Sequence, residues 1–134
     1  MNVVFVDYTE QYYSVVTQAP MPDKHSGKFV QMRHYDTEYL IFSPKELTPY
    51  HGDIVERFCR DKGIDGAFEG RQKYFAIHDT SWVIVGGGKF EIDKVKKYVR
   101  LYDDSMAYGK FNPDGLKDKI LQIAQMANHE VKVE

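Results

Sequence analysis

One stretch of small residues, placed between a strand and a helix start, constrains this chain more than any other feature. The alternation of apolar and polar residues over Tyr98–Tyr102 predicts a strand. Asp104–Gly109 follows it, and Asn112-Pro113 then has the form of a helix start. Small residues at such a bend leave backbone N–H groups free and let another molecule approach the chain closely. The stretch therefore predicts an anion pocket, to which the Ser105 hydroxyl would contribute.

Short strand patterns dominate the rest of the chain. We expect strands at Val3–Val6, Tyr12–Thr17, Lys28–Arg33, Glu38–Phe42, Tyr74–Ile77 and Trp82–Val85. The proline- and glycine-rich stretch 18–27 predicts a loop, and so does Gly66–Gly70. No linker-like composition divides the 134 residues, so we expect a single domain over residues 1–134.

Two stretches have the signals of helices. Thr48-Pro49 fits an N-cap followed by a proline at the first helical position, and Gly63 fits the helix end. The buried face of this helix would consist of Ile54, Val55, Phe58 and Cys59. A second helix would begin at Asn112 and bury Leu116, Ile120, Ile123, Ala124 and Ala127, with a charged tail from His129. The predicted class is α+β: a single mixed β-sheet of about six or more strands with two α-helices packed on it.

Composition narrows the range of partners and compartments. The formal charge of −2 gives no electrostatic reason to expect nucleic acid or a membrane surface as a partner. No stretch approaches the roughly 20 consecutive apolar residues that a membrane span needs. Cys59 is the only cysteine, which excludes an internal disulfide and is compatible with a reducing compartment. We therefore expect a cytoplasmic protein.

His51 differs from the other four histidines in its setting. With Thr48 as the N-cap, His51 would be the third residue of the helix, beside free N–H donors. The positive end of a helix disfavours a protonated imidazole, so a neutral ring able to act as nucleophile or base is expected near neutral pH. A surface histidine in a first helical turn is the alternative at this point. No histidine has the spacing of a metal site, so we expect no metal.

Three other features favour structural roles. Gly86–Lys89 lacks the GxxxxGK[ST] spacing of a phosphate-binding P-loop, and it predicts a glycine-rich turn between strands. Cys59 has Asp65 where a cysteine-dependent phosphatase needs an arginine, so we assign Cys59 to the core. Asp53 is expected to cap the start of its own helix.

Taken together, three motifs resemble those of the protein histidine phosphatases, the janus/ocnus family. Tyr50–Ile54 resembles the helix-start motif of that family, Gly86–Lys89 its glycine turn and Ser105–Gly109 its SMAYG signature. The resemblance covers roughly residues 28–121. It implies a phosphatase that removes phosphate from phosphohistidine in proteins, with phospholysine as an alternative substrate and with no metal or other cofactor.

The resemblance also implies roles for individual residues. His51 would be the essential histidine, acting as nucleophile or as general base. The residues that would bind the substrate phosphate are Gly52, Ser105, Met106, Ala107, Lys89 and Lys28. Lys89 takes the place of a basic residue that is often arginine in the family. The expected partner is a phosphohistidine-containing protein, and we expect the enzyme to act as a monomer.

The chain departs from the family pattern in three places. Ser43 lies about where the family usually has an arginine, which favours an alternative function: a non-catalytic phosphate- or phosphopeptide-binding module of the same fold. The segment 67–82 is longer than in the family and is expected to add a strand or an edge to the sheet. The first 27 residues have no secure counterpart.

Overall fold

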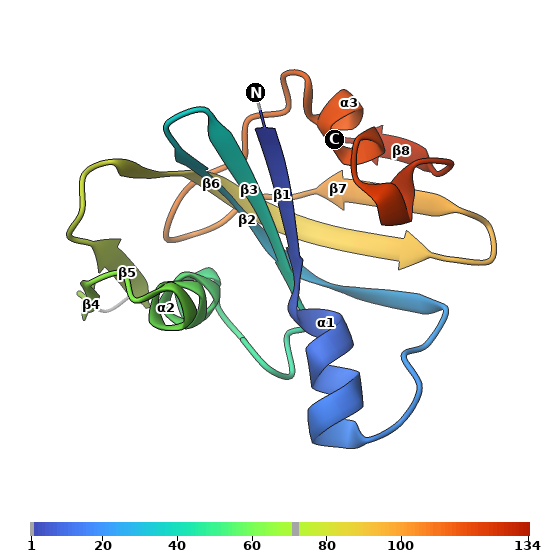
Figure 1. Ribbon diagram of the computed structural model, residues 1–134, viewed down its shortest axis with the longest axis horizontal. Helices are drawn as coiled ribbons and strands as arrows, with labels where there is room; N and C mark the ends of the chain where they lie inside the picture. The colour runs from blue at the N-terminus through green and yellow to red at the C-terminus, as the bar shows by residue number, and fades with distance from the viewer. Residues whose placement is uncertain (1, 71–72) are drawn as a thin grey trace.

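A curled six-stranded sheet organises the molecule, and the computed structural model describes residues 2–70 and 73–134 (Figure 1). Its strands are β1 (Asn2–Asp7), β2 (Lys24–His34), β3 (Thr37–Ser43), β6 (Trp82–Asp93), β7 (Tyr98–Tyr102) and β8 (Glu130–Val133). They lie in the order β1-β3-β2-β6-β7-β8. The four central strands are antiparallel, whereas β1 and β8 run parallel to their neighbours, so the sheet is mixed as predicted.

Short helices and a second, smaller sheet complete the fold. The second sheet pairs β4 (Gly66–Glu69) with β5 (Tyr74–Ile77). The helices are α1 (Tyr8–Gln11), the π-helix η1 (Tyr12–Thr17), α2 (His51–Lys62), α3 (Leu116–Leu121) and the 3₁₀-helix η2 (Ala124–Met126). The α+β class is confirmed, but the expectation of a single sheet with two helices was too simple.

Alternating side chains divide the core between the two faces of the sheet. Phe29 and Phe42 belong to the cluster that α3 covers, whereas Val30 and Ile41 belong to the cluster that α2 covers. Figure 1 shows α2 with β4 and β5 to one side of the sheet and α3 to the other. The apolar face predicted for α2 is confirmed, since Ile54, Val55, Phe58 and Cys59 are all buried.

Three predictions near the N-terminus and in the middle of the chain were wrong. Tyr12–Thr17 is helical, because Asp7 caps a helix start by accepting a hydrogen bond from the Thr9 N–H, and the chain continues in that conformation. None of its side chains is buried, so an apolar pattern there had no sheet to join. The loop predicted for 18–27 ends early, because β2 begins at Lys24, and Gly66–Glu69 is strand β4.

The three consecutive glycines form no turn and lie inside the continuous strand β6. A Cβ at Gly86 would lie 2.3 Å from the Lys110 carbonyl oxygen, and a Cβ at Gly88 would lie 2.6 Å from the Tyr102 carbonyl oxygen. Close packing against neighbouring backbone therefore explains these two glycines.

Helix α2 begins two residues later than predicted. The Thr48 hydroxyl donates within the preceding turn, where the Ser43 hydroxyl and the Pro44 carbonyl are its acceptors. Tyr50 is the N-cap instead, and the Asp53 carboxylate accepts a hydrogen bond from the Tyr50 N–H at 3.0 Å, as expected for a structural aspartate. His51 is consequently the first residue of the helix and not the third.

The C-terminal region also differs from the prediction. Asn112 caps a turn by accepting from the Asp114 N–H, and α3 begins only at Leu116, after Gly115 in the left-handed region with φ 69°. Leu116, Ile120 and Ile123 are buried as predicted, but Ala124 and Ala127 are exposed and Met126 fills the core instead. The charged tail forms β8, the edge strand next to β7.

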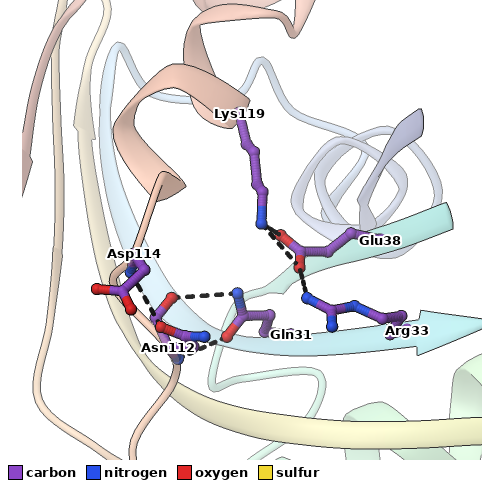
Figure 2. A network of polar contacts seen from close by, with 6 residues as sticks. All are labelled: Gln31, Arg33, Glu38, Asn112, Asp114 and Lys119. Atoms are coloured by element: carbon purple, nitrogen blue, oxygen red, sulfur yellow. Dashed lines mark hydrogen bonds and ion pairs between the residues drawn. The ribbon is translucent and has the colours of Figure 1, made fainter. Parts of the chain in front are cut away.

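A buried polar network joins the sheet to α3 (Figure 2). The Glu38 side chain has no exposed surface and lies between the ammonium group of Lys119 at 3.1 Å and the guanidinium group of Arg33 at 3.2 Å. Beside it, the buried Gln31 donates to the Asn112 carbonyl and accepts from the Asn112 N–H. These contacts fix the segment that leads from the Ser105 bend to α3.

Candidate active site

All seven residues predicted for the site line one pocket of about 330 Å³. They are Lys28, His51, Gly52, Lys89, Ser105, Met106 and Ala107. The start of α2, the strands β2 and β6, and the bend after β7 provide these residues, so four separate parts of the chain meet there. Four further residues line the pocket: Tyr50, Lys73, Asp103 and Asp104.

The His51 ring is held in one orientation and one tautomer. Its Nε2 lies 2.9 Å from the carbonyl oxygen of Gly88, and because a carbonyl can only accept, Nε2 carries the proton. Nδ1 then has the free lone pair, and none of the described residues forms a hydrogen bond with it. Burial lowers the pKa of His51, and the Lys28 ammonium group acts in the same direction. The ring is therefore neutral near pH 7, with Nδ1 available to a ligand.

A glycine in β6 makes room for this ring. A Cβ at Gly87 would lie 2.7 Å from His51 Cδ2 and 3.1 Å from Nε2. Gly87 faces α2, opposite to the two glycines that flank it in the strand. The third glycine of the motif is thus explained by the position of the imidazole.

Free backbone donors border the pocket on two sides. At the start of α2, the N–H groups of Asp53 and Ile54 donate to the Tyr50 carbonyl. The N–H groups of His51 and Gly52 come earlier in the helix and have no acceptor among the described residues. In the bend after β7, the N–H groups of Met106 and Ala107 likewise have no acceptor among the described residues. Free N–H groups on residues that line one pocket favour the binding of an anion there.

The backbone N–H of Ser105 is not one of the free donors expected in this bend. Its N–H donates to the Gly109 carbonyl at 3.2 Å, so this group is not free for a ligand. Its hydroxyl oxygen accepts from the Tyr108 N–H at 3.1 Å, which leaves the hydroxyl proton to donate. Ser105 therefore stabilises the bend and has one donor left for the pocket.

The pocket contains more positive than negative side chains. Lys28 Nζ donates to the Pro49 carbonyl at 2.7 Å, and burial lowers the pKa of this lysine, with the nearby Lys89 charge as the next cause. Lys89 forms an ion pair with Asp103 at 3.0 Å, which raises the pKa of Lys89. Lys73 adds a third ammonium group. The pocket is suited to a compact anion such as a phosphoryl group.

A larger cavity of about 520 Å³ lies elsewhere, where β2 and β6 pair near Lys24 and Asp93. Its charged lining residues are of both signs, two lysines and two carboxylates, and no helix begins among them. It therefore has no cluster of free N–H donors comparable to the start of α2, and we assign the site to the smaller pocket.

Comparison with known proteins agrees with the motifs. A sequence model of the Janus/Ocnus family matches residues 15–129. The chain belongs to the Janus/Ocnus family. A search of curated proteins gave no match. The match begins at residue 15, so it includes residues 15–27 of the N-terminal region for which the motifs offered no counterpart.

Two departures from the Janus/Ocnus pattern have structural explanations. Ser43 is fully buried, accepts a hydrogen bond from Thr48 and does not line the pocket, so it cannot replace an arginine there. The longer segment 67–82 forms the β4–β5 sheet, which packs on α2 and does not extend the main sheet. Lys73, which lines the pocket, was missed because no motif includes it.

The described residues include neither a cluster suited to a metal ion nor a helix suited to a membrane. Among the described residues, no group of three His, Cys, Asp or Glu side chains could hold a metal ion. No helix in the described part of the chain is long and apolar enough to cross a membrane. Metal independence stays a prediction that experiment must test.

Cys59 is buried in the core as predicted, and burial raises the pKa of its thiol to about 11.

Proposed function

We propose that this Janus/Ocnus protein is a phosphatase that hydrolyses the P–N bond of phosphohistidine in proteins. The observation that supports it most directly is the orientation of His51. Its Nε2–H is bound to the Gly88 carbonyl, so the unprotonated Nδ1 is left for the substrate. A buried, neutral imidazole with one fixed tautomer is the arrangement that a nucleophile or a general base needs.

The reaction requires little chemical assistance beyond this nitrogen. The imidazole of phosphohistidine leaves easily once its nitrogen accepts a proton. In one route His51 Nδ1 attacks phosphorus, the substrate P–N bond breaks, and water then hydrolyses the phosphorylated His51. In the other route Nδ1 takes a proton from water as the water oxygen attacks phosphorus, the P–N bond breaks, and the substrate imidazole leaves with a proton on its nitrogen. Trapping a phosphorylated enzyme in acid-free quench would distinguish the first route from the second.

Fixed donors would stabilise the charge that develops on the phosphoryl oxygens. The N–H groups of Gly52, Met106 and Ala107 have no acceptor among the described residues, and the Ser105 hydroxyl proton is available. Lys28 and Lys89 supply positive charge at the edge of the pocket. Because these groups are in place before substrate binds, no rearrangement is needed at the moment of reaction.

A non-catalytic phosphate-binding module is the second candidate. The observation that favours it is that Ser43 is buried away from the pocket and that none of the described lining residues is an arginine, the side chain that binds phosphate in a bidentate manner. The two candidates differ in turnover. A phosphohistidine peptide that is bound but stays intact for hours would support the module and would overturn the proposed hydrolase.

Release of inorganic phosphate from a phosphohistidine peptide tests the proposal. The parent protein should release phosphate catalytically, and His51→Ala should reduce the rate to background while the fold remains intact by circular dichroism. A variant that retains the parent rate would show that Nδ1 of His51 is not the reacting nitrogen.

A further inference from the structure

We infer that Lys73, which directly precedes β5, is a phosphate-binding residue of this pocket and sets its preference for dianionic groups. The inference rests on the proposed function of the pocket as a phosphoryl site. It assigns a binding role to a segment that no motif of the sequence includes.

The other two lysines of the pocket are already engaged by the protein. Lys28 Nζ donates to the Pro49 carbonyl, and Lys89 Nζ is paired with the Asp103 carboxylate. Among the described residues, no carboxylate lies within 4.0 Å of the Lys73 ammonium group, and no acceptor forms a hydrogen bond with it. Lys73 is therefore the pocket lysine whose charge is most available to a ligand.

An aromatic ring beside the pocket keeps this ammonium group near the site. Lys73 Nζ lies 5.9 Å from the centre of the Tyr50 ring, and Lys28 Nζ lies 5.5 Å from the same centre. Tyr50 immediately precedes His51 in the chain. A cation that contacts this ring is thus held next to the start of α2, where the free N–H groups lie.

Backbone contacts fix Lys73 to the rest of the site. A Cβ at Gly52 would lie 1.7 Å from the Lys73 carbonyl oxygen, so the lysine packs directly on the first turn of α2. The Tyr108 hydroxyl accepts from the Phe75 N–H and donates to the Phe75 carbonyl, both at 2.8 Å. The Tyr74 and Tyr108 rings are in contact, with centres 4.8 Å apart.

These contacts connect the small sheet to two parts of the pocket, the start of α2 and the bend after β7. Tyr108 lies in the same bend as Ser105, so β5 is bound to this bend on one side and to the helix start on the other. The small sheet therefore borders the pocket, and its contacts with the bend and with the helix start fix the position of Lys73.

The test compares Lys73→Met with Lys97→Met. Methionine keeps most of the length of the side chain and removes its charge. Lys97 is a matched control because it is exposed and has the same left-handed backbone, with φ 53° at both positions. It lies in the turn between β6 and β7, at the far end of the sheet from β4 and β5 (Figure 1).

Two measurements are made on each protein: binding of inorganic phosphate by calorimetry across the pH range in which phosphate becomes a dianion, and hydrolysis of a phosphohistidine peptide. Lys73→Met should weaken phosphate binding and raise KM by roughly five- to thirtyfold, since in water a unit charge about 4 Å from another contributes about fivefold and a dianion about the square of that. The loss should be larger for the dianion than for the monoanion. Lys73→Arg should restore most of the binding, and kcat should change little.

The outcomes separate this inference from the proposed function. Unchanged binding and KM in Lys73→Met, with normal hydrolysis by the parent, would overturn the inference and leave the phosphatase intact. Phosphate binding that depends on Lys73, without hydrolysis by the parent, would support the inference and overturn the phosphatase. An equal loss in Lys97→Met would also overturn the inference, because it would reflect overall charge.

Discussion

Replacing Gly87 by alanine should misplace the His51 ring more than it damages the fold. The added Cβ would lie 2.7 Å from His51 Cδ2 and 2.9 Å from the Phe29 carbonyl oxygen. Carbon atoms in contact lie about 3.5–4.0 Å apart, so the ring must move away by roughly 1 Å. This movement would break or lengthen the bond from Nε2–H to the Gly88 carbonyl.

The expected size of the effect follows from these contacts. Overpacking of a core typically costs about 1–3 kcal/mol of the free energy of unfolding. For a chain of this length such a cost lowers the melting temperature by roughly 3–12 °C. A displacement of about 1 Å of a reacting group can reduce the rate on the order of 100-fold. The loss of activity should therefore greatly exceed the fraction of protein that is unfolded.

The assay is kcat/KM for phosphate release from a phosphohistidine peptide, well below the melting temperature of each variant. Gly86→Ala is the matched control, because its Cβ would clash with the Lys110 carbonyl and would not touch His51. Gly86→Ala should lose stability and keep most of its activity per folded molecule. Parent-like activity in Gly87→Ala, or an equal loss in both variants, would refute the role given to the ring position.

Four further predictions address the Glu38 network, the ionisation of His51, and the roles of Ser105 and Met106 in the bend after β7. Glu38→Gln should lower the free energy of unfolding by about 3 kcal/mol, because Arg33 and Lys119 lose a buried, negatively charged partner. Denaturant titration measures this change, and a variant as stable as the parent would contradict the network. The rate of phosphate release should be constant above the pKa of His51 and should fall as the pH drops through this pKa. Because burial lowers the pKa of His51 from 6.5, a fall in rate centred above pH 6.5 would contradict the neutral imidazole. Ser105→Ala should reduce kcat/KM by about tenfold, which is less than the loss in His51→Ala, because only one hydrogen bond is removed. Met106→Ala should retain phosphate binding, because the Met106 side chain is 88% exposed and only its N–H would contact phosphate. Isothermal titration with phosphate tests the last expectation, and a large loss in Met106→Ala would assign the side chain a direct role.

The sequence predicted the composition of the pocket better than the shape of the fold. Periodicity identified the buried face of α2, because a helix repeats its environment every 3.6 residues whatever its partners are. The pocket residues were found together because three motifs resembling those of one family occur in order along the chain, at the start of α2, in β6 and in the bend after β7. Sequence alone thus placed His51 and Ala107 near each other.

The errors share a physical cause, which is that tertiary packing decides the conformation of ambiguous segments. Consecutive glycines predict a turn unless a neighbouring backbone lies against the strand, as Lys110 does at Gly86. A threonine before a proline predicts an N-cap unless its hydroxyl is already bound, as that of Thr48 is. The charged tail became β8 because its backbone pairs with β7, which polar side chains at an edge do not prevent. Lys73 was missed because only the packing of β5 on α2 brings it to the pocket.

The central claim is that Nδ1 of His51 acts on a phosphoryl group bound by the neighbouring N–H donors. Phosphate release from a protein phosphorylated chemically on histidine, measured with and without a chelator for the parent and His51→Ala, tests it most directly. The account predicts equal release by the parent under both conditions and background release by the variant. Release by His51→Ala at the parent rate would contradict it.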